Sequence, residues 1–317
     1  MWNSSKVIWK NNIWAPLKTL HSSFRRKPES SIFKGLWIPT FVGMTFLEVP
    51  ICLLTLLCLL SSCGKDYVTG KDVYNLYPIS TDVELGQGVM QQQLKELKKN
   101  KKKTDLEASP EEYRRIRRIA QRIAAVSHVS KFPYEAHLAD VDIVNAWCAP
   151  GGKIMVYTGL WDKKKGLVNE GDEDELAAVI GHEVAHATAR HVTESISQQV
   201  SLQVAGAVAT SAIAGAGAGD GADLFQKVFS EGMNVYLPSY SRKNESEADA
   251  IGIMYMAMAG YDPRAAVRLW ERAAKAKKDE KTSISASHPA SGERAKKLKE
   301  LLPKALEIYN AVGLAPR

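Results

Sequence analysis

The chain has 317 residues, of which 45% are hydrophobic, 24% charged and 8% aromatic. This is the composition of an ordinary globular protein, and it excludes a disordered, collagen-like or multispan membrane protein. The formal net charge is +7, but residues 1–62 hold seven Lys or Arg and two acids and therefore contribute +5 of it. The other 35 basic and 33 acidic residues leave only +2. A nucleic-acid partner is therefore not expected.

Residues 1–62 are expected to be a targeting segment. Residues 49–60 form a run of twelve residues without a charge, which is too short to span a membrane but suits the core of a signal peptide. The motif LSSC follows, ends at Cys63 and resembles a bacterial lipobox, so we expect Cys63 to be lipidated. An ordinary signal peptide, or a short anchor with a coincidental cysteine, is the alternative. Residues 1–43 show no periodic pattern and suggest a wrongly assigned start codon, with Met44 as the other start.

The use of cysteine fits an exported protein. Two of the four cysteines lie in the removable segment and Cys63 is the expected anchor, which leaves Cys148 alone. A mature chain with one thiol forms no disulfide framework, and such a chain suits the oxidising bacterial periplasm. We therefore expect residues 63–80 to be a lipid-anchored tether. Gly64 stands where many inner-membrane lipoproteins have Asp, and this resemblance favours the outer membrane.

Residues 81–317 are expected to form one mainly α-helical domain with a small β-sheet, an α+β fold. Ser109 before a proline predicts the start of a helix, and Pro150-Gly151-Gly152 predicts a turn between two strands. The Ala- and Gly-rich residues 204–219 predict a small-residue helix that ends in a Gly loop, with a membrane-dipping hairpin as the alternative. We expect helices at 80–99 (capped by Ser80, Thr81 or Asp82), 109–127, 172–200, 221–236, 241–259, 263–277 and 290–310, and strands at 134–143 and 153–157.

The segment 181–191, GHEVAHATARH, carries the chemistry. His182 and His186 are four residues apart, so on a helix their imidazoles share one face and reach one ion, while Glu183 points at the open position of that ion. This ligand pattern is that of zinc hydrolases, and it predicts one Zn²⁺ per chain. The alternative is an amphipathic helix that exposes two histidines, which the alanines between the polar positions argue against.

A catalytic zinc needs a third protein ligand. A metzincin would place Gly and His at positions that here hold Ala189 and Val192, so that class is excluded. A gluzincin takes a Glu from a later helix, and Glu245 with Asp249 four residues on would share a helical face. We expect Glu245 to bind zinc and Asp249 to orient a ligating histidine, whereas Glu247 faces away. A charged, solvated helix face is the alternative.

Four motifs carry a resemblance to a known family: NAWCAPGGKIMVYTGL at 145–160, HEVAH at 182–186, SRKNESEAD at 241–249 and SHPASGER at 287–294. Together they resemble the HtpX and prenyl-protease type zinc metallopeptidases (the M-48 family), and most closely their periplasmic lipoprotein and mitochondrial-OMA-like members. The resemblance spans about residues 81–302. It implies a gluzincin-type metalloprotease domain, with Glu245 as the zinc ligand and His288 near the zinc-bound water. Packing or capping of the last helix is the alternative role of His288.

These expectations combine into a zinc endopeptidase that acts on misfolded or stalled envelope proteins. Glu183 would take a proton from water and return it to the leaving amine, and His288 would stabilise the oxyanion. Asn145, Gly151 and Gly152 are expected to contact an extended substrate that adds to a sheet edge as a strand. The alternative is a zinc-dependent chaperone or assembly factor for outer-membrane proteins with little proteolysis. The sequence leaves the oligomeric state open.

Overall fold

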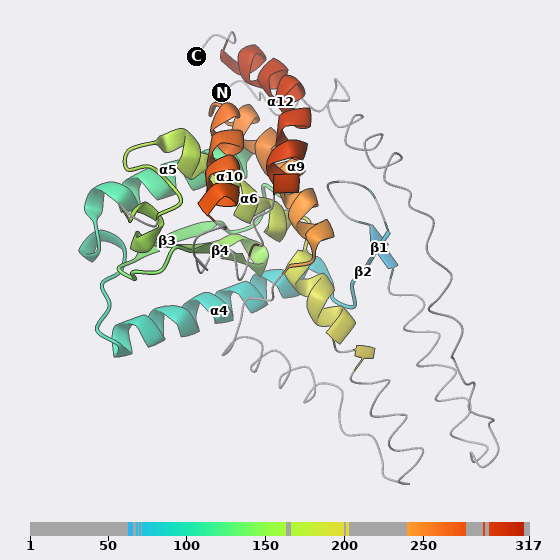
Figure 1. Cartoon of the computed structure of the whole chain (residues 1–317). Helices are drawn as coiled ribbons and strands as arrows, with labels where there is room; N and C mark the ends of the chain where they lie inside the picture. The colour runs from blue at the N-terminus through green and yellow to red at the C-terminus, as the bar shows by residue number, and fades with distance from the viewer. Residues whose placement is uncertain are drawn as a thin grey trace, which may run out of the picture. The chain divides into compact units, whose positions relative to one another are not determined.

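The structure is a computed structural model of the whole chain (Figure 1). It describes residues 63–65, 68, 70, 72–162, 166–199, 201–202, 240–276, 288 and 292–313. The chain divides into two compact units, Met1–Gly64 and Lys65–Arg317. The short strand β1 (Cys63–Lys65) spans the boundary, and β2 (Asp72–Tyr74) follows it. The predicted signal segment, including residues 49–60, lies outside the described residues.

A three-stranded mixed sheet forms the centre of the second unit. Its strands are β3 (Glu135–Ala139), β4 (Ala146–Ala149) and β5 (Lys153–Tyr157), in the order β3-β5-β4. β5 runs parallel to β3 and antiparallel to β4. The two predicted strands are confirmed, whereas β4 was not predicted, because all four of its residues are buried and a short buried run shows no alternation.

Two helices of the N-terminal half flank the sheet. On one face, α4 (Ile79–Lys99) packs its Val89 and Met90 against a cluster that includes Trp147 and Met155. On the other, α5 (Pro110–Val126) contacts β3. Both helices occur where they were predicted, and the Ser109 side chain accepts a hydrogen bond from the N–H of Glu112. Short 3-10 turns lie at η2 (Asp105–Glu107), η3 (Pro150–Gly152) and η4 (Thr158–Trp161).

The start of α4 differs from the prediction. Pro78 occupies the N-cap position and no side chain caps the helix. Asp82, one of the predicted caps, is fully buried and instead accepts hydrogen bonds from Nε and Nη2 of Arg190 at 2.6 and 3.0 Å. A charge-assisted, two-pronged pair of this kind is stronger than a neutral cap.

The long helix predicted at 172–200 is wrong in length, because it is divided in two. The first part, α6 (Glu173–Thr188), begins at Asp172, whose side chain accepts from the N–H of Glu175. Arg190 then takes a left-handed conformation with φ of 59°, and a new helical run covers residues 191–199. The ion pair of Arg190 with the start of α4 holds this bend.

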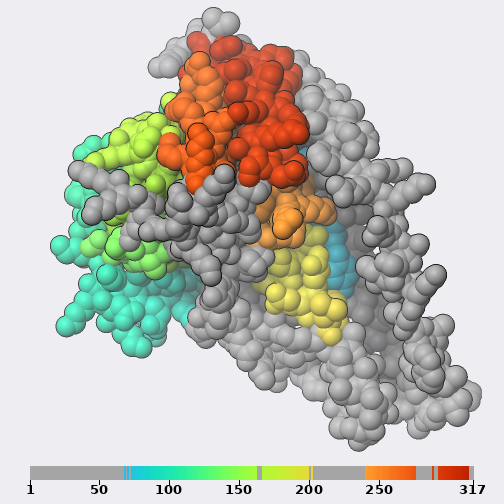
Figure 2. All heavy atoms as spheres, viewed as in Figure 1, coloured from blue at the N-terminus to red at the C-terminus, as the bar shows by residue number. Residues whose placement is uncertain are grey.

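Three C-terminal helices complete the fold, as predicted: α9 (Arg242–Met258), α10 (Arg264–Ala276) and α12 (Gly292–Gly313). α9 packs against α6 and α12, and α10 packs against α6 and α12. Figure 2 shows α10 and α12, in orange and red, together at the top of the face in view, with α4, in turquoise, at the lower left. The expected helix at 221–236 and the segment 204–219 lie outside the described residues.

The described part of the chain is therefore mainly helical with a small sheet, as expected. Its fully buried side chains lie mostly on α5, α6 and the sheet: Ile116, Ile119, Ile123, Leu138, Ile154, Leu176 and Ile180. Among the described helices, none combines the length and the apolar character that a bilayer crossing requires.

Candidate metal centre

One helix carries the two histidines and the acid of the motif. His182, Glu183 and His186 lie in the last two turns of α6 and are all at least 97% buried. The two imidazole rings lie 4.7 Å apart between centroids, as expected of residues that stack one turn apart. The alternative of two histidines on a solvated helix face is therefore wrong.

The second helix approaches α6 very closely. Gly181 of α6 and Gly252 of α9 meet backbone to backbone: a Cβ atom on Gly252 would lie 2.9 Å from the amide nitrogen of His182, closer than side chains pack. Glycine at both positions lets the two axes approach. This contact places Glu245, about two turns back along α9, beside both histidines. Glu245 is 1% exposed, so the alternative of a charged, solvated helix face is wrong as well.

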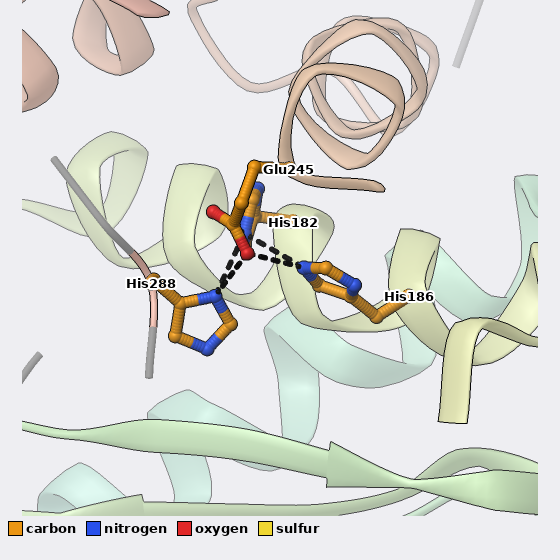
Figure 3. A group of neighbouring side chains, drawn as sticks. All are labelled: His182, His186, Glu245 and His288. Carbon is orange, nitrogen blue, oxygen red and sulfur yellow. Dashed lines mark hydrogen bonds and ion pairs between the residues drawn. The ribbon is translucent and has the colours of Figure 1, made fainter. Parts of the chain in front are cut away.

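Four donor atoms meet at this crossing (Figure 3), contributed by His182, His186, Glu245 and His288, and all lie within 4.8 Å of one another. Nε2 of His182 is 3.1 Å from Nε2 of His186 and 3.3 Å from Nδ1 of His288. Oε1 of Glu245 is 3.0 Å from that Nδ1 and 3.4 Å from Nε2 of His186. Ligands about 2.0–2.1 Å from a tetrahedral zinc are separated by about 3.3 Å. The donor spacing therefore fits zinc.

His288 holds a position that the sequence did not assign to it. Its Nδ1 forms the fourth corner of the donor cluster, while its Nε2 lies 3.4 Å from Oε1 of Glu183. A catalytic zinc keeps its fourth corner for water or substrate. In this structure all four donors of the cluster are protein side chains.

The outer nitrogens of the two histidine ligands also have partners. Nδ1 of His182 lies 3.0 Å from Oδ1 of Asp249, the position predicted for it. Nδ1 of His186 lies 2.9 Å from Nδ1 of His191. Such contacts fix the tautomer and the ring orientation of a metal ligand. Glu247 supplies none of the four donors, and its Oε2 lies 3.8 Å from Nε2 of His191.

Three residues near the metal centre were missed by sequence reasoning. His191 ends the 181–191 segment, but it lies outside the His-Glu-x-x-His pattern from which the ligands were predicted. Tyr240 stacks on the His186 ring at 3.7 Å between centroids, and no motif signalled it. Arg294 ends the quoted SHPASGER motif and contacts two of the three acids of α9, Glu245 and Asp249. Its place in a motif was the one signal that could have identified it.

The surplus of buried negative charge at the site favours binding of a divalent cation. Three buried carboxylates, those of Glu183, Glu245 and Asp249, face a single buried arginine, Arg294, which leaves two negative charges without a fixed cation. Oε2 of Glu183 is buried and accepts no hydrogen bond. Unpaired buried charge is costly, and Zn²⁺ would balance these two charges. The donor set, the spacing and the charge therefore all fit zinc.

The pKa shifts reflect the same set of buried, closely spaced ionisable groups. Burial alone would lower the pKa of His182, but Asp249 and Glu245 outweigh it and raise the pKa to about 9. Burial would raise the pKa of Glu245, yet hydrogen bonds from the surrounding histidines lower it. Burial raises the pKa of Glu183. Without metal a proton on His182 therefore partly balances the carboxylates, and zinc binding must release that proton.

The predicted substrate-binding residues lie at and beside β4. Asn145 precedes β4, and its carbonyl accepts from the N–H of Tyr157. Gly151 and Gly152 are buried, with φ of 70° and 81°. A Cβ atom would meet the backbone of Val83 at Gly151 and the ring of Tyr134 at Gly152. Both glycines thus pack the turn against its neighbours, and their role in substrate binding stays a prediction.

The metal centre is of the gluzincin type. It consists of two histidines from one buried helix, a glutamate from a second helix and an acid beside them. The sequence model described as Peptidase family M48 matches residues 110–302. This chain therefore belongs to Peptidase family M48. The matched range covers α5, the sheet, α6, α9, α10 and the first half of α12.

Curated relatives agree with this membership. The chain is 38% identical over 194 residues to mitochondrial metalloendopeptidase OMA1 of Schizosaccharomyces pombe, covering 60% of this chain and 53% of that protein. It is 33% identical to OMA1 of Arabidopsis thaliana, covering 60% of this chain and 36% of the relative. It is 27% identical to metalloprotease LoiP of Escherichia coli, covering 63% and 74%. The match thus spans about half or less of the two OMA1 proteins.

Proposed function

We propose that this chain is a zinc metalloendopeptidase that hydrolyses peptide bonds in misfolded or stalled envelope proteins. The observation that carries the proposal is the buried set of four metal donors with the motif acid beside it: Glu183 Oε1 is 3.4 Å from the fourth donor residue. Relatives named as metalloendopeptidases support the activity. A binding protein would have no use for a buried general base at this position.

The residues divide the chemistry among them. His182, His186 and Glu245 would hold zinc, which when bound polarises the scissile carbonyl and acidifies a water molecule. Glu183 accepts the proton of that water and donates it to the leaving amine. Burial raises the pKa of Glu183, and this brings its carboxyl closer to the range in which it both accepts and returns a proton. Stabilisation of the oxyanion by His288 requires its ring to leave the donor cluster.

The location of this activity is part of the proposal. We place the enzyme in the bacterial periplasm, anchored through a lipid on Cys63 at the outer membrane. The lipobox-like motif and the short apolar run before it support the anchor. Metabolic labelling with a radioactive fatty acid tests it: label is expected on the wild-type chain, and a Cys63→Ala chain that is labelled equally contradicts it.

One observation favours a second candidate function, a zinc-dependent chaperone or assembly factor with little proteolysis. Nδ1 of His288 closes the donor cluster, at 3.0 Å from Glu245 and 3.3 Å from His182. A site with four protein donors is the arrangement of structural zinc. Under this candidate, Glu183→Gln would leave envelope assembly intact.

Cleavage of one polypeptide in two states tests the proposed substrate class. The zinc-loaded chain is incubated with a small disulfide protein, either native or reduced and carboxymethylated. We expect cleavage of the unfolded form and at least about tenfold slower cleavage of the native form, because an extended segment must enter the site. Equal cleavage of both forms contradicts selection for unfolding. Prevention of aggregation without cleavage supports the chaperone.

A further inference from the structure

We propose that Arg294 is a positioning residue of the metal centre, which sets zinc affinity by holding Glu245 and Asp249 in place together. The inference rests on the proposed zinc site. Arg294 lies in the first turn of α12, a helix that supplies none of the four donor atoms, and it is 3% exposed. A buried arginine is kept only where its charge is paired.

The guanidinium of Arg294 grips Asp249 with two parallel hydrogen bonds. Nε donates to Oδ2 and Nη2 donates to Oδ1, both at 2.7 Å. The same Oδ1 lies 3.0 Å from Nδ1 of His182. Arg294 thus fixes the carboxylate that in turn fixes the ring of a metal ligand.

The third nitrogen of the guanidinium faces a metal ligand directly. Nη1 of Arg294 lies 2.6 Å from Oε2 of Glu245, while the other oxygen, Oε1, faces the donors of His186 and His288. Oε2 also lies 3.5 Å from Nε2 of His182, so both oxygens of Glu245 border the donors, and Arg294 holds the carboxylate in that place. The central carbon of the guanidinium, Cζ, lies over the ring of Trp270, 3.6 Å from its centroid, which limits the movement of the group.

Lysine would not replace this arrangement. A guanidinium offers five N–H groups in a fixed plane, whereas an ammonium is a point charge on a flexible stem. Lysine at position 294 would keep the positive charge and the overall charge balance of the site. It would lose the simultaneous grip on Asp249 and Glu245. The Arg294→Lys substitution therefore separates positioning from charge.

The test measures zinc affinity, not activity. The full chain is stripped of metal and titrated with zinc against a chromophoric chelator, as wild type and as Arg294→Lys. The matched control is Arg272→Lys, because Arg272 also grips a buried acid, Glu175, with Nη1 and Nη2 at 2.9 and 2.6 Å, away from the four donors. Loss of an outer partner typically weakens metal binding about 10–100-fold. We expect that loss for Arg294→Lys and wild-type affinity for Arg272→Lys.

The outcomes separate the two levels of the proposal. Wild type that binds no zinc overturns the metal centre, and the role of Arg294 with it. If Arg294→Lys weakens zinc binding threefold or less, the role of Arg294 is overturned and the metal centre stands. The role is also overturned if Arg272→Lys weakens zinc binding as much as Arg294→Lys does. If Arg294→Lys does not fold, Trp270→Leu replaces it, because it frees the guanidinium and changes no charge; unchanged zinc affinity in that variant overturns the role.

Discussion

Each end of α6 carries a buried acid with an arginine of a later helix nearby, and the two ends differ in charge balance. Near its start, the fully buried Glu175 pairs with Arg272 of α10 at 2.6 Å and also accepts from the N–H of Asn169. Near its end, Arg294 contacts two acids of α9, Glu245 and Asp249, and Glu183 is a third buried acid close to the same single positive charge. One carboxylate meets one arginine in the first case, and three meet one in the second.

This difference separates a stabilising pair from a binding site. The pair at Glu175 satisfies both carboxylate oxygens with protein groups, so nothing further is needed there. At the other end, Oε2 of Glu183 is buried without a hydrogen bond, and three histidines direct nitrogens inward. A surplus of buried negative charge with inward-facing donors is a place prepared for a cation.

Removing zinc should produce the largest effect on activity and on stability. The effect should arise at the end of α6 that carries Glu183. Chelation is expected to abolish cleavage, and added zinc to restore it. Zinc at about 1,000 times its dissociation constant would stabilise the chain by about 4 kcal/mol, which raises the melting temperature by roughly 8–16 °C. Differential scanning calorimetry with and without zinc measures this. A melting temperature indifferent to zinc would contradict the metal centre.

Glu175→Gln tests the start of α6, where one buried carboxylate pairs with one arginine. The substitution leaves Arg272 without its charged partner, and we expect a loss of about 2–3 kcal/mol in the free energy of unfolding. Zinc stoichiometry should stay at the wild-type value. Urea unfolding and metal analysis measure the two quantities. Loss of zinc without loss of stability would reverse the assignment of the two ends.

Gly252→Ala tests the close contact between α6 and α9 that brings Glu245 beside the two histidines. The new methyl group would lie about 2.9–3.0 Å from the backbone of Gly181 and His182 and push α9 from α6. We expect about 1–3 kcal/mol of destabilisation together with weaker zinc binding. Gly88→Ala is the control, because nothing lies within 4 Å of a Cβ atom there and alanine favours a helix. Equal stability and equal zinc affinity of the two variants would show that the close contact does not shape the metal centre.

His128 should give the smallest effect, on acid stability. Its Nδ1 lies 2.7 Å from the hydroxyl of Tyr255, and burial lowers its pKa from 6.5 to about 4. The unfolded chain therefore binds this proton more readily, so stability present above pH 6.5 is lost as pH falls toward 4. We expect His128→Phe, compared with wild type in metal-free protein, to lose less stability over this range, by about 1–2 kcal/mol. Parallel losses in both proteins would exclude His128 as the cause.

Sequence reasoning identified local features well and distant contacts poorly. The spacing of His182 and His186 and the helical phase of Glu245 and Asp249 follow from helix geometry, so these four residues were found. Arg294 and Tyr240 reach the site only through the packing of α12 and of the segment before α9, which no local pattern encodes. The bend after α6 was missed for the same reason, because Asp82 lies 108 residues from Arg190.

Cleavage of casein by wild type and Glu183→Gln, both carrying the same measured amount of zinc, tests the central claim most directly. General acid–base groups contribute about 10²–10⁴-fold to rate, so Glu183→Gln should lose at least about 100-fold while zinc affinity stays near that of wild type. Equal cleavage by both proteins would show that Glu183 is not the base and would contradict the account of this site.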